Sequence, residues 1–191
     1  DNEDQFHKKL NKNIKKINPS KEQVLSKAFQ LHSQGNIEEA AKYYQYLIIQ
    51  GVRDHRVFSN YGLILKVLGK LKEAEITTRK AIELNPNYAL GYSNLGGILN
   101  SLGKLKEAEL STRKAIELNP EYANAHYNLG NILRDLKKLS EAAISLKKAI
   151  KLKPNFFEAH RDLGICLYLL KDIDSALKYI VKANYFDNKN R

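Results

Sequence analysis

Asparagine recurs at a spacing of 34 residues in this 191-residue chain, at Asn60, Asn94 and Asn128. A carboxamide carries one acceptor oxygen and two N–H donors, so it can pair with both polar groups of a peptide backbone. Equal spacing gives the three side chains the same place in successive repeats. The pattern therefore indicates a row of carboxamides suited to binding an extended polypeptide.

The residues that could support catalysis or metal binding fall instead on repeat positions that suit packing. Cys166 takes the place that isoleucine holds in other units, at Ile64, Ile98 and Ile132, which favours a buried thiol over a nucleophile. His126 and His160 are 34 residues apart and share one place in the repeat, which favours packing over a metal site. No glycine-rich phosphate loop occurs. We therefore expect no enzyme, no cofactor and no metal.

The composition is that of a basic, water-compatible chain. Charged residues make up 28% of it and the formal net charge is +11. The sequence contains no run of 18 or more apolar residues, the length that a membrane-spanning helix needs, and no secretory signal pattern is visible. A single cysteine cannot form an internal disulfide, which suits a reducing compartment. We expect a cytoplasmic protein.

A repeat organises the chain. The stretch Leu102–Pro120 reads LGKLKEAELSTRKAIELNP, and Leu68–Pro86 matches it except at two positions. A looser copy runs from Leu136 to Pro154. A fixed period of this size is typical of stacked repeat architectures, in which neither helix of a unit buries its apolar face alone.

The period divides the chain into five units with short flanking segments. The units are predicted at residues 21–54, 55–88, 89–122, 123–156 and 157–188, with a tail at 189–191. Residues 1–20 form a basic N-terminal segment with apolar residues on one helical face. Three interpretations remain open for it: a solvated terminus, a helix capping the first unit, or an amphipathic segment for a partner or lipid surface.

Each unit contains two helical patterns separated by a turn. Gly103 stands where a left-handed residue would end the first helix, and Gly35 and Gly69 take this place in the first two units. Lys137 and Lys171 replace the glycine later, so these turns should carry some strain or a different geometry. Glycine also recurs in the first helix, and alanine in the second, at Ala108 and Ala142 among others. Such small residues predict close helix crossings.

These recurring residues carry a resemblance to the tetratricopeptide repeat (TPR) family. The third unit presents the family pattern at Tyr92, Leu95, Gly96, Leu99, Ala108, Thr112, Ala115 and Pro120. The resemblance covers residues 21–188 and is weakest in the first unit, where Lys27 and Ala28 replace Leu and Gly. It implies an all-α, right-handed superhelical α-solenoid of five helix-turn-helix units.

The resemblance also implies which side chains line a concave peptide-binding groove. The residues that match the family's groove positions are Asn60, Lys66, Asn94, Asn128, Asn131, Arg134 and Arg161. The row is similar to the asparagine ladder of O-linked sugar transferases. It departs from the carboxylate clamp of chaperone co-factors, because Leu90 stands where that clamp needs a basic residue. The alternative is that the asparagines only bridge neighbouring helices.

The function implied is a non-enzymatic scaffold that binds a protein or peptide, with the cations favouring an acidic one. The alternatives are the recognition arm of a larger enzyme, such as a transferase, and a basic nucleic-acid or membrane binder. Lysines crowd the fourth unit, but no aromatic residues interleave with them for base stacking. This disfavours nucleic acid and membrane as partners. Some of Tyr179, Val181, Tyr185 and Phe186 should lie exposed, so we also expect the terminal repeat to pack against a second copy, as a homodimer, or against missing sequence.

Overall fold

The computed structural model describes residues 20–189, and these form ten α-helices without a β-strand. The all-α class predicted from the sequence is therefore confirmed. Except for Ser20, the predicted N-terminal segment lies outside the described residues, as do residues 190–191 of the predicted tail.

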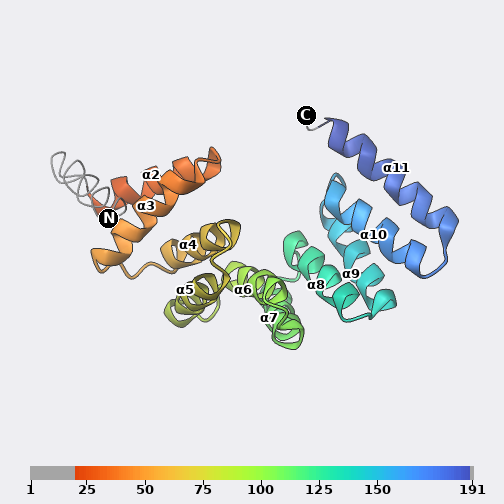
Figure 1. Ribbon diagram of the computed structural model, residues 1–191, viewed down its shortest axis with the longest axis horizontal. Coiled ribbons are helices and arrows are strands. Elements are labelled where there is room, and N and C mark those ends of the chain that lie inside the picture. Colours follow the sequence, from red (N-terminus) through yellow and green to blue (C-terminus); the bar gives the residue numbers. More distant parts are fainter. Residues whose placement is uncertain (1–19, 190–191) are drawn as a thin grey trace. The chain divides into compact units, whose positions relative to one another are not determined.

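The helices fall into two compact units that divide between Pro86 and Asn87. The first unit contains two helical hairpins (Figure 1), built from α2 (Lys21–Ser33), α3 (Ile37–Ile49), α4 (His55–Val67) and α5 (Leu71–Leu84). Helix α3 packs on α2 and also on α4. The second helix of one hairpin thus covers the first helix of the next.

The second unit continues the same pattern with three hairpins. Its helices are α6 (Ala89–Ser101), α7 (Leu105–Leu118), α8 (Ala123–Asp135), α9 (Leu139–Leu152), α10 (Phe157–Leu169) and α11 (Ile173–Lys189). Helix α8 contacts its neighbours α7 and α9 as well as the first helices α6 and α10. The first helices of this unit therefore form one continuous layer, with the second helices outside it.

Side-chain capping marks where α2 and α4 begin. The Ser20 hydroxyl accepts from the backbone N–H of Gln23 at 3.2 Å, and the Gln23 side chain accepts from the Ser20 N–H at 2.8 Å. This reciprocal pair satisfies two N–H groups that have no partner inside the helix. Asp54 caps α4 in a similar way by accepting from the Arg56 N–H at 2.8 Å.

A left-handed residue ends each first helix, as predicted for the turns that contain glycine. At the end of α6, Gly103 has φ of 74° and the Lys104 N–H returns to the Leu99 carbonyl at 2.9 Å. At the end of α8, Lys137 adopts the same conformation with φ of 63°. A side chain at this φ crowds the backbone, so Lys137 carries strain that glycine avoids. Lys171, with φ of 66°, repeats the situation after α10.

The small residues lie where helices cross closely. Ala108 and Ala142 are fully buried. A Cβ atom built on Gly96 would overlap the Thr112 hydroxyl of α7, and one on Gly130 would lie 2.6 Å from Cγ of Leu146. The predicted close crossings are therefore confirmed, and side chains of the second helix fill the space that each glycine leaves.

Candidate functional site

The first helices of the second unit carry most of the predicted site. We call the layer of α6, α8 and α10 the first-helix surface, and it holds Asn94 on α6, Asn128, Asn131 and Arg134 on α8, and Arg161 on α10. Asn60 and Lys66 lie on α4 in the first unit. The predicted residues thus separate into a group of five and a group of two.

Asn128 on this surface is engaged with the neighbouring helix. Its Nδ2 donates to the Ser93 hydroxyl at 3.1 Å and to the Ser93 carbonyl oxygen at 3.3 Å. Ser93 is buried on α6. The interaction is the helix bridge that the sequence left open as an alternative, so Asn128 contributes to holding α6 against α8.

The bridge from Asn128 belongs to a regular series. Tyr127 donates to Oδ2 of Asp162 at 3.0 Å, and Nδ2 of Asn100 donates to Oδ2 of Asp135 at 3.1 Å. Each of the three bonds joins residues 35 apart, one more than the repeat length. The sequence interpretation missed Ser93, Tyr127 and Asp135 because it compared residues at the repeat spacing, whereas the contacts need an offset of one.

Asp162 is the centre of a charged cluster between α8 and α10. The residue is 4% exposed, and it accepts from the Tyr127 hydroxyl and, at 3.0 Å, from Nε of Arg161. Nη1 of Arg134 lies 3.8 Å from its Oδ1. The hydrogen bond to Asp162 raises the pKa of Arg161, and burial followed by the Asp162 charge raises the pKa of Tyr127. A buried carboxylate therefore holds two guanidinium groups on the first-helix surface.

The two arginines differ in how fully they are used. Nε of Arg161 donates a hydrogen bond to Asp162, although the Arg161 side chain is 54% exposed. Within residues 20–189, Arg134 makes only long ion pairs, at 3.8 Å to Asp162 and 3.6 Å to Asp135, both beyond hydrogen-bond length. Guanidinium N–H groups on both side chains are therefore available to a carboxylate brought by a ligand.

The remaining asparagines are half-buried. Asn94 lies on α6, and the side-chain oxygens of Asn100 and Asn131 are buried without a hydrogen-bond partner among residues 20–189. In the first unit, Asn60 approaches the hydroxyl of buried Tyr44 without forming a well-aligned hydrogen bond. Burial lowers the pKa of Lys66 on the same helix.

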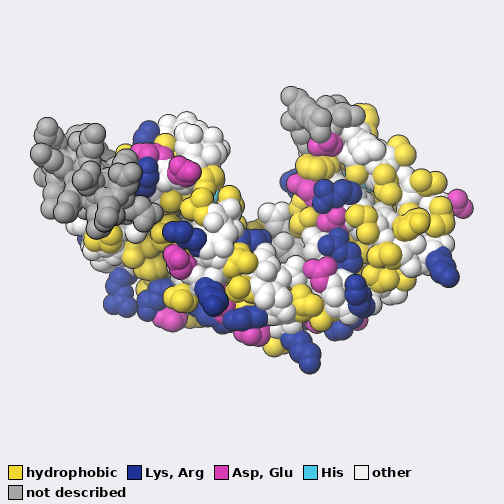
Figure 2. Space-filling view, viewed as in Figure 1, with side chains coloured by type: hydrophobic (Ala, Val, Ile, Leu, Met, Phe, Trp, Pro, Cys, Tyr) yellow, Lys and Arg dark blue, Asp and Glu magenta, His cyan; other side chains and the backbone are white. Residues whose placement is uncertain are grey.

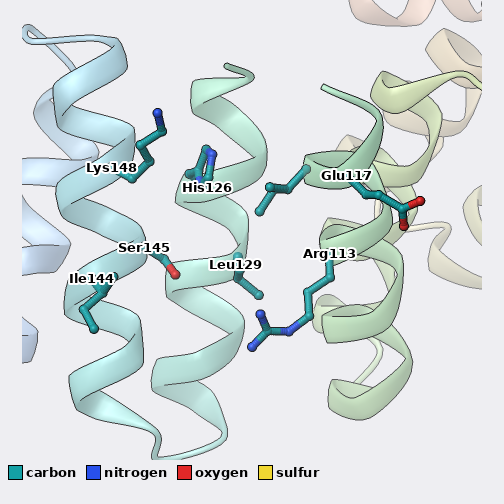
Figure 3. A pocket seen from close by; sticks show the side chains of 8 residues that line it. Arg113, Glu117, His126, Leu129, Ile144, Ser145 and Lys148 are labelled. Carbon is teal, nitrogen blue, oxygen red and sulfur yellow. The ribbon is translucent and has the colours of Figure 1, made fainter. Parts of the chain in front are cut away.

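A pocket that the sequence did not indicate lies between α7, α8 and α9 of the second unit (Figure 3). It has a volume of about 590 Å³, and its lining comes from α7, α8 and α9: Arg113, Ile116, Glu117, His126, Leu129, Ile144, Ser145 and Lys148. Nε2 of His126 lies 2.8 Å from the Pro120 carbonyl oxygen and therefore carries the proton. The imidazole thus anchors the chain before α8, and Nε2 is not free for a metal.

Ion pairs neutralise part of the basic fourth repeat. Lys138 lies 3.1 Å from Glu109, and Lys148 lies 3.0 Å from Glu121. Lys153 stacks on Phe156, with Nζ 4.5 Å from the ring centre. Figure 2 shows acidic and basic side chains interspersed on the visible face. This arrangement leaves less unpaired positive charge for nucleic acid than the sequence count suggested.

The candidate nucleophile and the second histidine are packing residues, as predicted. Cys166 is fully buried, and burial raises the pKa of its thiol. His160 is 2% exposed, with ring centres of Tyr179 and Phe186 at 5.8 and 5.3 Å. Among the described residues, no three His, Cys, Asp or Glu side chains form a metal cluster. No helix in the described part of the chain is long and apolar enough to span a membrane.

Comparison with protein families agrees with the observed helix pairs. Four tetratricopeptide repeat models match residues 55–88, 77–109, 96–133 and 123–156, so together they cover 55–156. The chain belongs to the tetratricopeptide repeat (TPR) family. No curated protein matches the sequence of this chain.

Solved structures with the same TPR fold come from several bacteria. A thermophilic TPR protein of Thermus thermophilus is 22% identical over 86% of this chain and 90% of its own, with a TM-score of 0.76. Pseudomonas aeruginosa PilF is 21% identical over 87% and 76%, with a TM-score of 0.76. MamA from Desulfovibrio magneticus is 21% identical over 88% and 96%, with a TM-score of 0.72. These likenesses support the TPR fold.

Proposed function

We propose that this TPR protein is a non-enzymatic scaffold that binds an extended peptide across the first-helix surface of its second unit. Membership of the TPR family supports a role in protein interaction. The bound segment carries a carboxylate that Arg134 and Arg161 engage. Tolerance of ligand sequence comes from backbone pairing with carboxamides such as that of Asn94, and specificity comes from charge.

The cluster around Asp162 is the observation that carries this proposal. A buried carboxylate fixes Arg161 through one nitrogen and leaves the rest of an exposed guanidinium facing outward. Guanidinium groups held in advance lose less side-chain entropy when a ligand carboxylate binds. The long contacts of Arg134 keep its donors available beside the same carboxylate. The cluster therefore suits a single acidic side chain or C-terminal carboxylate of the ligand.

Three sets of short fluorescein-labelled peptides test the proposal. The sets are randomised except at a central residue, which is Glu, Gln or Lys. Fluorescence anisotropy should show the Glu set binding most tightly, and Arg134→Gln should weaken its affinity by about tenfold, the loss expected for a hydrogen bond to a charged group. Arg161→Gln should have a similar effect, with circular dichroism checking that α10 is intact.

Arg113→Gln is the matched control, because Arg113 is similarly exposed but lies on α7, outside the first-helix surface. It should bind the Glu set as the parent protein does. Equal affinity for the Glu, Gln and Lys sets would overturn the charge preference. Unchanged affinity in both arginine variants would place the peptide elsewhere.

A further inference from the structure

The pocket between α7, α8 and α9 has the lining of a binding site but holds no tyrosine or phenylalanine ring of its own. Its volume of about 590 Å³ is within the range of pockets that bind ligands. Its apolar lining consists of Ile116, Leu129 and Ile144, and Arg113 and Lys148 add positive charge. Figure 3 shows the Arg113 side chain extending from α7 toward α8. We call this site the α7–α9 pocket.

The corresponding space one repeat later is filled by a ring of the chain itself. Three lining residues recur with the same types 34 residues on, since Ile116, His126 and Leu129 correspond to Ile150, His160 and Leu163. In that later space the ring centre of Tyr179, on α11, lies 5.8 Å from that of His160. Tyr179 packs against the core cluster that contains Leu163, and His160 is only 2% exposed. An aromatic ring therefore fits this combination of isoleucine, histidine and leucine.

Serine at position 145 leaves the α7–α9 pocket open. Ser145 on α9 holds the place that Tyr179 holds on α11, 34 residues later. A serine side chain ends at its hydroxyl, so it cannot cover His126, which is half-buried. One repeat earlier the serine recurs at Ser111, but there Tyr92 replaces the histidine. Both neighbouring repeats thus have a tyrosine at one of these two places, and the pocket has none.

The cations at the pocket already have carboxylate partners. Arg113 lies 2.8 Å from Glu109 and 3.4 Å from Glu141, and Lys148 lies 3.0 Å from Glu121. These pairs reduce the attraction of both cations for a further carboxylate. A cation next to the face of an aromatic ring still attracts the ring, and the alkyl part of each side chain adds apolar contact. The charges therefore favour an aromatic ring over an acidic group.

We propose that the α7–α9 pocket binds a tyrosine or phenylalanine side chain of a protein partner. The ring takes the place beside His126 that Tyr179 takes beside His160, and it packs on Leu129. Ile144, which is 68% exposed at the pocket, contacts the partner next to the ring. This site is separate from the first-helix surface, so this proposal and the proposed function can each fail alone.

Nuclear magnetic resonance of the isotope-labelled full chain tests which side chain binds. The probes are the N-acetyl amides of tyrosine, leucine and serine, each added up to about 10 mM because ligands of this size bind weakly. The tyrosine amide should shift the backbone signals of Leu129 and Ser145. The leucine amide should bind about three- to fivefold more weakly, since it lacks a ring for the cations to attract, and the serine amide should cause no shift. Equal affinity for the tyrosine and leucine amides, or no shift with the tyrosine amide, would overturn the proposal.

Ser145→Tyr supplies the missing ring from the chain itself. It should raise the thermal midpoint by about 2–4 °C and abolish the shifts caused by the tyrosine amide, because its own ring occupies the pocket. Ser140→Tyr is the matched control, since it adds the same ring at an exposed position of α9 outside the pocket lining. The control should leave the midpoint and probe binding unchanged. A lower midpoint for Ser145→Tyr, or shifts that persist in this variant, would show that the pocket is not the place of the ring.

Discussion

The carboxamide of Asn128 donates to both the hydroxyl and the carbonyl oxygen of Ser93, at 3.1 and 3.3 Å. The two residues lie on α8 and α6, so one amide nitrogen ties successive repeats together. This asparagine has a structural role whether or not its oxygen also meets a ligand. Substitution of Asn128 therefore changes stability as well as binding, which is why the arginines give a cleaner binding test.

We predict that Asn128→Ala lowers the free energy of unfolding by about 0.5–1.5 kcal/mol, the usual net value of a hydrogen bond. Urea denaturation followed by circular dichroism measures this loss. In a double-mutant cycle, Ser93→Ala should couple to Asn128→Ala, because the hydroxyl bond is shared. Additive effects of the two substitutions would show that this bond contributes nothing to stability.

Strain at Lys137 makes a second prediction possible. Lys137→Gly should stabilise the chain by about 0.5–1 kcal/mol, because relief of the left-handed conformation exceeds the entropy that glycine loses on folding. The reverse change at the equivalent turn, Gly103→Lys, should destabilise by a similar amount. Urea denaturation of both variants is the measurement. Effects of the same sign at the two turns would contradict the explanation.

Ala108 tests the packing between the two helices of the third repeat. Ala108→Leu should destabilise the chain by about 1–3 kcal/mol, because a fully buried alanine at a helix crossing has no room for a larger side chain. Lys106→Leu adds a leucine at an exposed position of the same helix and serves as its control. A thermal melt of Ala108→Leu that matches the parent would show that the crossing is loosely packed.

The burial of Cys166 predicts slow thiol chemistry in the native state. Burial raises the pKa of the thiol, so at about pH 8 less of it is ionised than in free cysteine, and reagent access is blocked as well. Ellman's reagent should react only when urea unfolds the chain. The reaction of Ellman's reagent with free glutathione gives the rate expected for an unhindered thiol. Rapid reaction of the native protein would mean that α10 opens readily.

Much of the fold could be predicted because the repeat constrains it at every level. The period places the turn residues Gly35, Gly69 and Gly103. At Lys137 it left strain or a different geometry open, and the structure shows the left-handed turn. The same register explains why position 96 is glycine, since a Cβ atom there would overlap the Thr112 hydroxyl. Local sequence signals and packing agree at these positions, which is why the pattern sufficed.

The site was less predictable because contacts between repeats depend on helix offset. The spacing identified Asn128 as a member of a row, but its partner Ser93 lies one residue out of register. Asp162 lies 34 residues after Asn128 and so continues the asparagine row, but the spacing does not reveal the burial that makes Asp162 the centre of the arginine cluster. The pocket beside His126 combines side chains from three helices, and no sequence period records such a combination.

The packing of each helix mainly against its sequence neighbours has a consequence for folding kinetics. Chains dominated by such local contacts need little loop closure before the contacts form, and they fold quickly for their size. Repeats of this kind are stabilised by nearest-neighbour interfaces, so opening begins where an interface is missing. Helix α8, which contacts both α6 and α10, should therefore have the slowest amide hydrogen exchange of the second unit. Helix α11 should exchange early.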